Sequence, residues 1–98
     1  MRIATLLSYA GGFKQAVAEV QELEKAGLDV VWVPEAYSFD APSAMGYLAA
    51  QTERVTIASG ILPIYTRTPS LLAMTAAGVD YLSDGRARLG LGASGTQP

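Results

Sequence analysis

Short runs with the pattern of strands alternate along the chain with longer stretches in which apolar residues recur at the period of a helix. The runs lie at residues 3–8, 29–35, 55–57 and 86–92, and residues 30–33 of the second are continuously apolar, which is typical of a parallel strand covered on both faces. Residues 13–26, the stretch after Asp40 and residues 70–82 have the helical pattern. The chain therefore predicts strands and helices in strict alternation.

Helix boundaries are marked by residues with capping chemistry. Gly27 is placed to end the first helix in a left-handed turn. Asp40 and Thr68 are expected to cap the next two helices, each with a proline in the first turn, and Asp84-Gly85 signals a turn. The positions predicted to face the core are Phe13, Ala16, Val17, Val20 and Leu23 in the first helix, Met45, Leu48 and Ala49 in the second, and Leu71, Leu72, Thr75, Val79 and Leu82 in the third.

The spacing of the strands indicates an α/β fold with a parallel sheet. The four runs start near residues 3, 29, 55 and 86, which is the period of a repeated βα unit. Periodicity alone leaves a barrel and an open doubly wound sheet as alternatives, and four units are half of an eightfold barrel of about 250 residues. We expect residues 1–98 to form a single partial domain of four βα units with the last helix missing.

Composition narrows the classes of function. Half of the 98 residues are hydrophobic and 16% are charged, as in a chain that forms a core. The net charge of −2, without a basic cluster, argues against a nucleic-acid partner. The absence of cysteine and histidine removes the commonest metal ligands and the commonest general base. No apolar run is long enough for a membrane span, so we expect a soluble, cytoplasmic protein.

Candidate chemistry gathers where the predicted parallel strands end, because ligands bind at the carboxyl ends of such sheets. Glu35 ends an apolar run, where desolvation favours a role as acid or base; a solvated carboxylate or a partner for an arginine is the alternative. Tyr37 is placed to stack on a ligand ring or to cover the barrel mouth. Arg67 is placed to pair with a phosphate or carboxylate, or to face solvent. Asp40 is better explained as a helix cap than as a catalytic group.

Two further stretches carry small residues. Ala58, Ser59 and Gly60 end the third run, and small residues allow a flat ligand to approach the backbone. The spacing of Gly90, Gly92 and Gly95 matches that of a dinucleotide-binding loop. Its place on the fourth strand, with no helix behind it, argues against that function, although a turn offering backbone N–H groups to a phosphate fits.

Four motifs together resemble the luciferase-like monooxygenase family. They lie at residues 27–35, 50–63, 65–69 and 85–95, and they read GLDVVWVPE, AQTERVTIASGILP, YTRTP and GRARLGLGASG. Within the family, the chain is most similar to the deazaflavin (coenzyme F-420)-dependent oxidoreductases. The resemblance covers essentially the whole chain but only the N-terminal half of such an enzyme.

The resemblance implies a TIM (β/α)8 barrel that holds coenzyme F-420 or FMN with its ring across the carboxyl ends of the strands. It implies a bulge with a non-proline cis peptide at Gly60-Ile61 behind the ring, with Pro63 also on the cofactor. Ser94 and Gly95 are expected near the cofactor tail, and residues 35–37, including Glu35 and Tyr37, toward the ring and substrate. Many relatives have a histidine where this chain has Ala36, which argues against histidine-based proton transfer.

The function expected from the sequence is hydride transfer between coenzyme F-420 and a small organic substrate, by an oxidoreductase of which this chain is the N-terminal portion. One alternative is an FMN-dependent monooxygenase of the same family. Another is a non-catalytic half-barrel that folds only by self-association, since four units leave two sheet edges unpaired. We expect a homo-oligomer.

Overall fold

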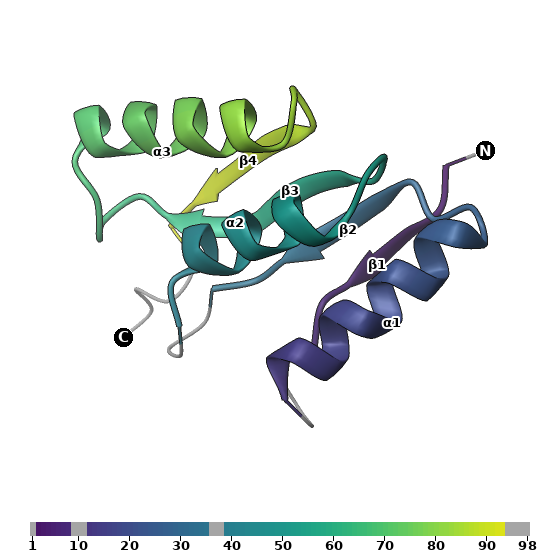
Figure 1. The fold of residues 1–98 in the computed structure, drawn as a ribbon. Coiled ribbons are helices and arrows are strands. Elements are labelled where there is room, and N and C mark those ends of the chain that lie inside the picture. The colour runs from purple at the N-terminus through teal and green to yellow at the C-terminus, as the bar shows by residue number, and fades with distance from the viewer. Residues whose placement is uncertain (1, 9–11, 36–38, 94–98) are drawn as a thin grey trace.

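The computed structural model describes residues 2–8, 12–35 and 39–93, which form one four-stranded parallel sheet and three helices (Figure 1). The elements are β1 (Ala4–Leu6), α1 (Phe13–Lys25), β2 (Val30–Val33), α2 (Ala41–Gln51), β3 (Thr56–Pro63), α3 (Pro69–Leu82) and β4 (Ala87–Gly92). The strands lie in sequence order, and each neighbouring pair is parallel. The predicted parallel α/β fold is confirmed.

The three helices cover the same face of the sheet (Figure 1). Strand partners in register lie on one face of a sheet, and the row from Thr5 through Val31 and Ile57 to Ala87 faces the helices. Val31 and Ile57 are fully buried there. The next row, which includes Leu6 and Trp32, faces the other way, and these two side chains are 63% and 40% exposed. The sheet therefore has one packed face and one open face.

The predicted core faces of the helices are confirmed in part. Ala16, Val17 and Val20 of α1 are buried, as are all three predicted positions of α2. Leu23, Leu71 and Leu82 were expected in the core, and this expectation is wrong, because they are 44%, 46% and 62% exposed. In α3 the buried residue is Val79. The helix packs against α2 and β4 on one side, and no described element covers its other side.

The helix ends use the predicted caps. The Asp40 carboxylate accepts hydrogen bonds from the Ser43 N–H at 3.0 Å and from the Ser43 hydroxyl at 2.7 Å. Thr68 Oγ1 accepts a hydrogen bond from the Leu71 N–H at 3.1 Å. Gly27 ends α1 at a φ of +110°, in the region that favours glycine. These local signals predicted the starts of α2 and α3 and the end of α1.

Two charged side chains that the sequence analysis did not single out join the elements at the amino end of the sheet. The Glu24 carboxylate is buried and accepts hydrogen bonds from the backbone N–H groups of Glu53, Arg54 and Val55, at 3.1, 2.6 and 2.8 Å. The Arg86 guanidinium donates hydrogen bonds to five oxygens. These are the backbone carbonyl oxygens of Ala49, Thr52, Val55 and Ser83 and the hydroxyl oxygen of Thr52. Both groups satisfy backbone atoms that would otherwise be left at helix ends and in loops.

A helix that spans a lipid bilayer needs about 20 apolar residues, and the helices of this chain are shorter. They contain 13, 11 and 14 residues. None of the helices in the described part of the chain is long and apolar enough to cross a membrane.

Candidate site at the carboxyl end of the sheet

Strand β3 carries a bulge near its carboxyl end. Ser59 lies opposite Leu89 and Leu62 lies opposite Leu91, so that Gly60 and Ile61 together face one residue of β4. The Gly60-Ile61 peptide bond is cis. The predicted bulge and the predicted cis peptide are both present, while the role of this segment behind a cofactor ring stays a prediction.

The glycines of β4 make room for the bulge. The Ser59 hydroxyl accepts a hydrogen bond from the Gly90 N–H at 2.8 Å and donates one to the Gly90 carbonyl at 3.0 Å. A Cβ atom on Gly90 would lie 2.5 Å from the Ser59 carbonyl oxygen, and one on Gly92 would collide with the Ile61 side chain. Packing against the β3 backbone therefore explains Gly90 without a nucleotide, whereas a Cβ atom on Gly92 would require only the end of the Ile61 side chain to shift. Gly95, the third glycine of the spacing, lies outside the described residues.

The indole of Trp32 lies against Gly60. A Cβ atom on Gly60 would be 2.9 Å from Trp32 Cε3, closer than real Cβ atoms approach a neighbour. Ala58 and Ser59 are buried, at 2% and 0% exposure. The expectation that small residues leave the backbone of β3 bare is therefore wrong on the side of Trp32, because the indole occupies that space.

Glu35 and Arg67 form a bidentate ion pair that joins the loop after β2 to the loop after β3. Arg67 Nη1 and Nη2 donate to the two carboxylate oxygens of Glu35, each at 2.8 Å. The side chains are only 15% and 9% exposed. The hydrogen bonds to Glu35 raise the pKa of the Arg67 guanidinium, so the arginine stays charged. Of the two alternatives predicted for Arg67, pairing with a carboxylate is the one observed.

The ion pair continues through a hydroxyl to the end of β3. Arg67 Nη1 donates to Thr66 Oγ1 at 3.2 Å, and Thr66 Oγ1 donates to the Pro63 carbonyl at 3.1 Å. Arg67 also acts on Asp40, whose pKa is lowered mainly by the hydrogen bond from the Ser43 hydroxyl and further by the charge of Arg67. The carboxyl ends of β2 and β3 are thus tied by charge-assisted hydrogen bonds.

The structure brings together four of the predicted site residues. Gly60, Ile61 and Pro63 lie in succession on β3, and Glu35 reaches Pro63 through the contacts of Arg67. Three other predicted site residues lie outside the described residues: Tyr37, Ser94 and Gly95. The roles of Trp32, Ser59 and Thr66 were not predicted from the sequence. For Trp32 the one available signal was a large side chain on the strand face opposite to that of Val31 and Val33.

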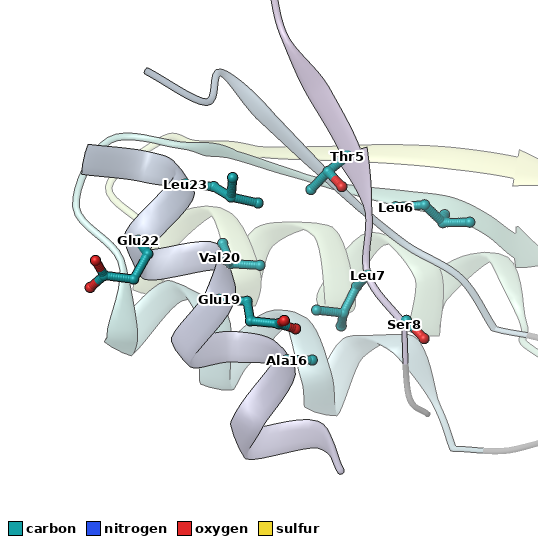
Figure 2. Close-up of a pocket in the computed structure, with 9 residues that line it drawn as sticks. All are labelled: Thr5, Leu6, Leu7, Ser8, Ala16, Glu19, Val20, Glu22 and Leu23. Carbon is teal, nitrogen blue, oxygen red and sulfur yellow. The ribbon is translucent and has the colours of Figure 1, made fainter. Parts of the chain in front are cut away.

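A separate groove of about 470 Å³ runs between β1 and α1 (Figure 2). Figure 2 shows Leu7 pointing from β1 toward α1, while Leu6 points away from the helix. Glu19 and Glu22 at the side of the groove are exposed. The groove follows the outer edge of β1, beyond which the described residues form no further strand, and it does not include the bulge.

Four parallel strands with helices on one face are the architecture of a half-barrel of βα units, with a ligand site expected at the carboxyl ends. The sequence profile of the luciferase-like monooxygenases matches residues 1–98. The chain belongs to the luciferase-like monooxygenase family.

Known relatives are longer oxidoreductases and monooxygenases. A protein of Mycobacterium tuberculosis named as a coenzyme F-420-dependent oxidoreductase is 38% identical over 99% of this chain, which spans 28% of that relative. The coenzyme F-420-dependent tetrahydromethanopterin reductase of Methanopyrus kandleri superposes with a TM-score of 0.79 at 24% identity, over 93% of this chain and 26% of that one.

A second solved structure has the same fold. The oxygenating constituent of a diketocamphane monooxygenase of Pseudomonas putida, in complex with FMN, superposes with a TM-score of 0.83 at 18% identity. The superposition covers 96% of this chain and 30% of that one. These likenesses identify the parallel sheet as one part of a TIM-barrel enzyme fold.

Proposed function

We propose that residues 1–98 are the N-terminal portion of a coenzyme F-420-dependent oxidoreductase that transfers a hydride between the coenzyme and a small organic substrate. The observation that carries the proposal is the 38% identity, over 99% of the chain, to the mycobacterial protein named for this coenzyme. The domain is then a partial barrel of four βα units without the last helix.

The residues on the open face of the sheet fit a flat ring. Leu6 and Trp32 offer exposed apolar surface there, and the bulge at Gly60 and Ile61 interrupts the regular strand beside Trp32. In the proposed site, Gly60, Ile61 and Pro63 hold the cofactor ring. The coenzyme supplies the redox chemistry, while the protein positions the ring and shields one of its faces.

The proposal also assigns Tyr37 to the ring and the substrate, and Ser94 and Gly95 to the phosphate of the cofactor tail; these three residues lie outside the described part of the chain. Glu35 is the candidate acid or base of the reaction. Its two carboxylate oxygens already accept hydrogen bonds from Arg67, so proton transfer through Glu35 requires that this pair opens.

An FMN-dependent monooxygenase is the second candidate function, and the fold of the FMN-bound Pseudomonas putida enzyme favours it. The two cofactors differ in absorption and emission, so a titration of the protein with each one separates the candidates. We expect saturable binding of coenzyme F-420 and weaker binding of FMN. The Gly60→Ala variant tests the proposed site itself, because its added methyl group displaces Trp32 from its contact with Gly60 and should weaken binding of the cofactor.

The titration with the two cofactors decides between the candidates. Preferential binding of FMN replaces the leading proposal by the second candidate. A folded protein that binds neither cofactor contradicts both for these residues, and it leaves the non-catalytic half-barrel as the description of the chain.

A further inference from the structure

We infer that Glu35 and Arg67 are positioning residues, whose ion pair ties the loop after β2 to the loop after β3 and so holds the β3 bulge in place. The inference deepens the proposed function and rests on it for its ligand, because the bulge is the segment proposed to hold the cofactor ring. The role differs from proton transfer, since neither side chain has to touch the substrate or the reacting atoms.

Residues of β2 and of the loop after it make two contacts near the bulge, one at Gly60 and one in the loop that follows β3. In the first contact the Trp32 indole lies against Gly60. In the second contact Glu35 binds Arg67, which binds Thr66, which in turn binds the Pro63 carbonyl. Ile61 and Leu62 lie between these two points, so one short segment, residues 32–35, sets the position of the bulge.

The ion pair between Glu35 and Arg67 fixes both the distance and the relative orientation of the two side chains. A guanidinium presents its donors in a rigid planar fork, and two parallel hydrogen bonds to one carboxylate fix direction as well as distance. The side chains of the pair are mostly buried, at 9% and 15% exposure, so solvent screens their attraction less than it screens an exposed pair. The pair between Lys25 and Glu22, with exposures of 76% and 75%, lacks both features and serves as a comparison.

The test uses Trp32 as an internal probe, because it is the only tryptophan of the chain and lies at the bulge. Glu35→Gln and Arg67→Lys each remove the paired fork while keeping a similar side-chain volume. We expect each to change the emission and the acrylamide quenching of Trp32. Glu22→Gln, the same substitution in the exposed pair, should leave both unchanged. Circular dichroism checks that each variant is folded.

A charge reversal adds a rescue. In the double variant Glu35→Arg with Arg67→Glu, a carboxylate and a guanidinium again face each other across the two loops. We expect the Trp32 signal to return toward that of the unmodified protein. The affinity for coenzyme F-420 should fall about tenfold in each single variant, and the double variant should recover most of it.

Two results would overturn the inference. One is a Trp32 signal that stays the same in both folded single variants. The other is loss of turnover in Glu35→Gln with an unchanged Trp32 signal and unchanged coenzyme affinity, which assigns Glu35 to proton transfer instead. If the unmodified protein binds no coenzyme, the proposed function fails, while the Trp32 signal still decides whether the pair positions the bulge.

Discussion

At the scale of single residues, the contact between Gly60 and Trp32 makes the sharpest prediction. Gly60→Ala places a methyl group 2.9 Å from Trp32 Cε3, and the indole must move. Inserting a methyl group into a packed site costs typically about 1–3 kcal/mol, so we expect the free energy of unfolding to fall by that amount. Urea unfolding followed by Trp32 fluorescence measures it.

The matched control is Gly46→Ala within α2, where an added Cβ meets nothing within 4 Å. Because alanine is favoured over glycine inside a helix by up to about 1 kcal/mol, this variant should be as stable as the unmodified chain or more stable. An equal loss of stability in the two variants would contradict the role given to Trp32.

Glu24 predicts a dependence of stability on pH. Burial alone would raise the pKa of this carboxyl, but hydrogen bonds from the backbone N–H groups of Arg54, Val55 and Glu53 outweigh it and lower the pKa below its ordinary value of 4.5. A depressed pKa in the folded state contributes stability that is present above pH 4.5 and is lost as the pH falls through the lower, folded value.

Glu24→Gln tests this contribution. The amide cannot reproduce three accepted hydrogen bonds, so we expect a loss of about 1–3 kcal/mol near neutral pH. The variant should then lose less stability than the unmodified chain as the pH falls below 4.5. Chemical unfolding across that range measures both effects. Asp40, whose pKa is also lowered, gives both proteins a shared acid-sensitive background, and parallel curves would contradict the assignment.

At the scale of elements, Arg86 joins the end of α2 to the turn before β4. Two of its five hydrogen bonds go to the Ala49 carbonyl in α2 and to the Thr52 carbonyl directly after it. Lysine has three donors and no planar fork, so Arg86→Lys leaves buried carbonyls without partners and should cost about 1–3 kcal/mol. The exposed neighbour Arg88, changed to Lys, is the control and should stay within about 0.5 kcal/mol. Thermal and urea unfolding compare the two.

The same elements show what a sequence can predict. The helices, their caps at Asp40 and Thr68, and the turn at Gly27 depend on residues a few positions apart, so local patterns were sufficient for them. The partner of Arg67 could not be derived in this way, because Glu35 is 32 positions away along the chain. The bulge was expected only from the resemblance to a family, since its packing against Gly90 and Gly92 depends on the register of two strands.

At the scale of the whole molecule, the three wrong predictions of core residues have one cause. Leu23, Leu71 and Leu82 are placed in their helices as core residues would be, yet they lie exposed. Leu71 and Leu82 face the side of α3 that no described element covers, and Leu23 lies in the groove beside the edge strand β1 (Figure 2). In an eightfold barrel, neighbouring βα units lie at these two edges. The helical pattern of these residues is therefore the one expected where further βα units cover both edges of the sheet.

The uncovered side of α3 predicts self-association of the chain. A stripe of exposed apolar side chains runs along α3, and contiguous apolar surface of this kind marks association sites. Its members are Leu71, Met74, Tyr81 and Leu82. We expect a second copy to cover the stripe, so that the mass measured by light scattering rises with protein concentration.

Replacing Met74 and Tyr81 by Gln should lower that mass and leave the free energy of unfolding within about 0.5 kcal/mol of that of the unmodified chain, because both side chains are exposed. The matched control is Ala18→Gln on the exposed surface of α1, which should change neither quantity. A mass equal to that of one chain at every concentration would show that α3 needs no cover and that the half-barrel is stable alone.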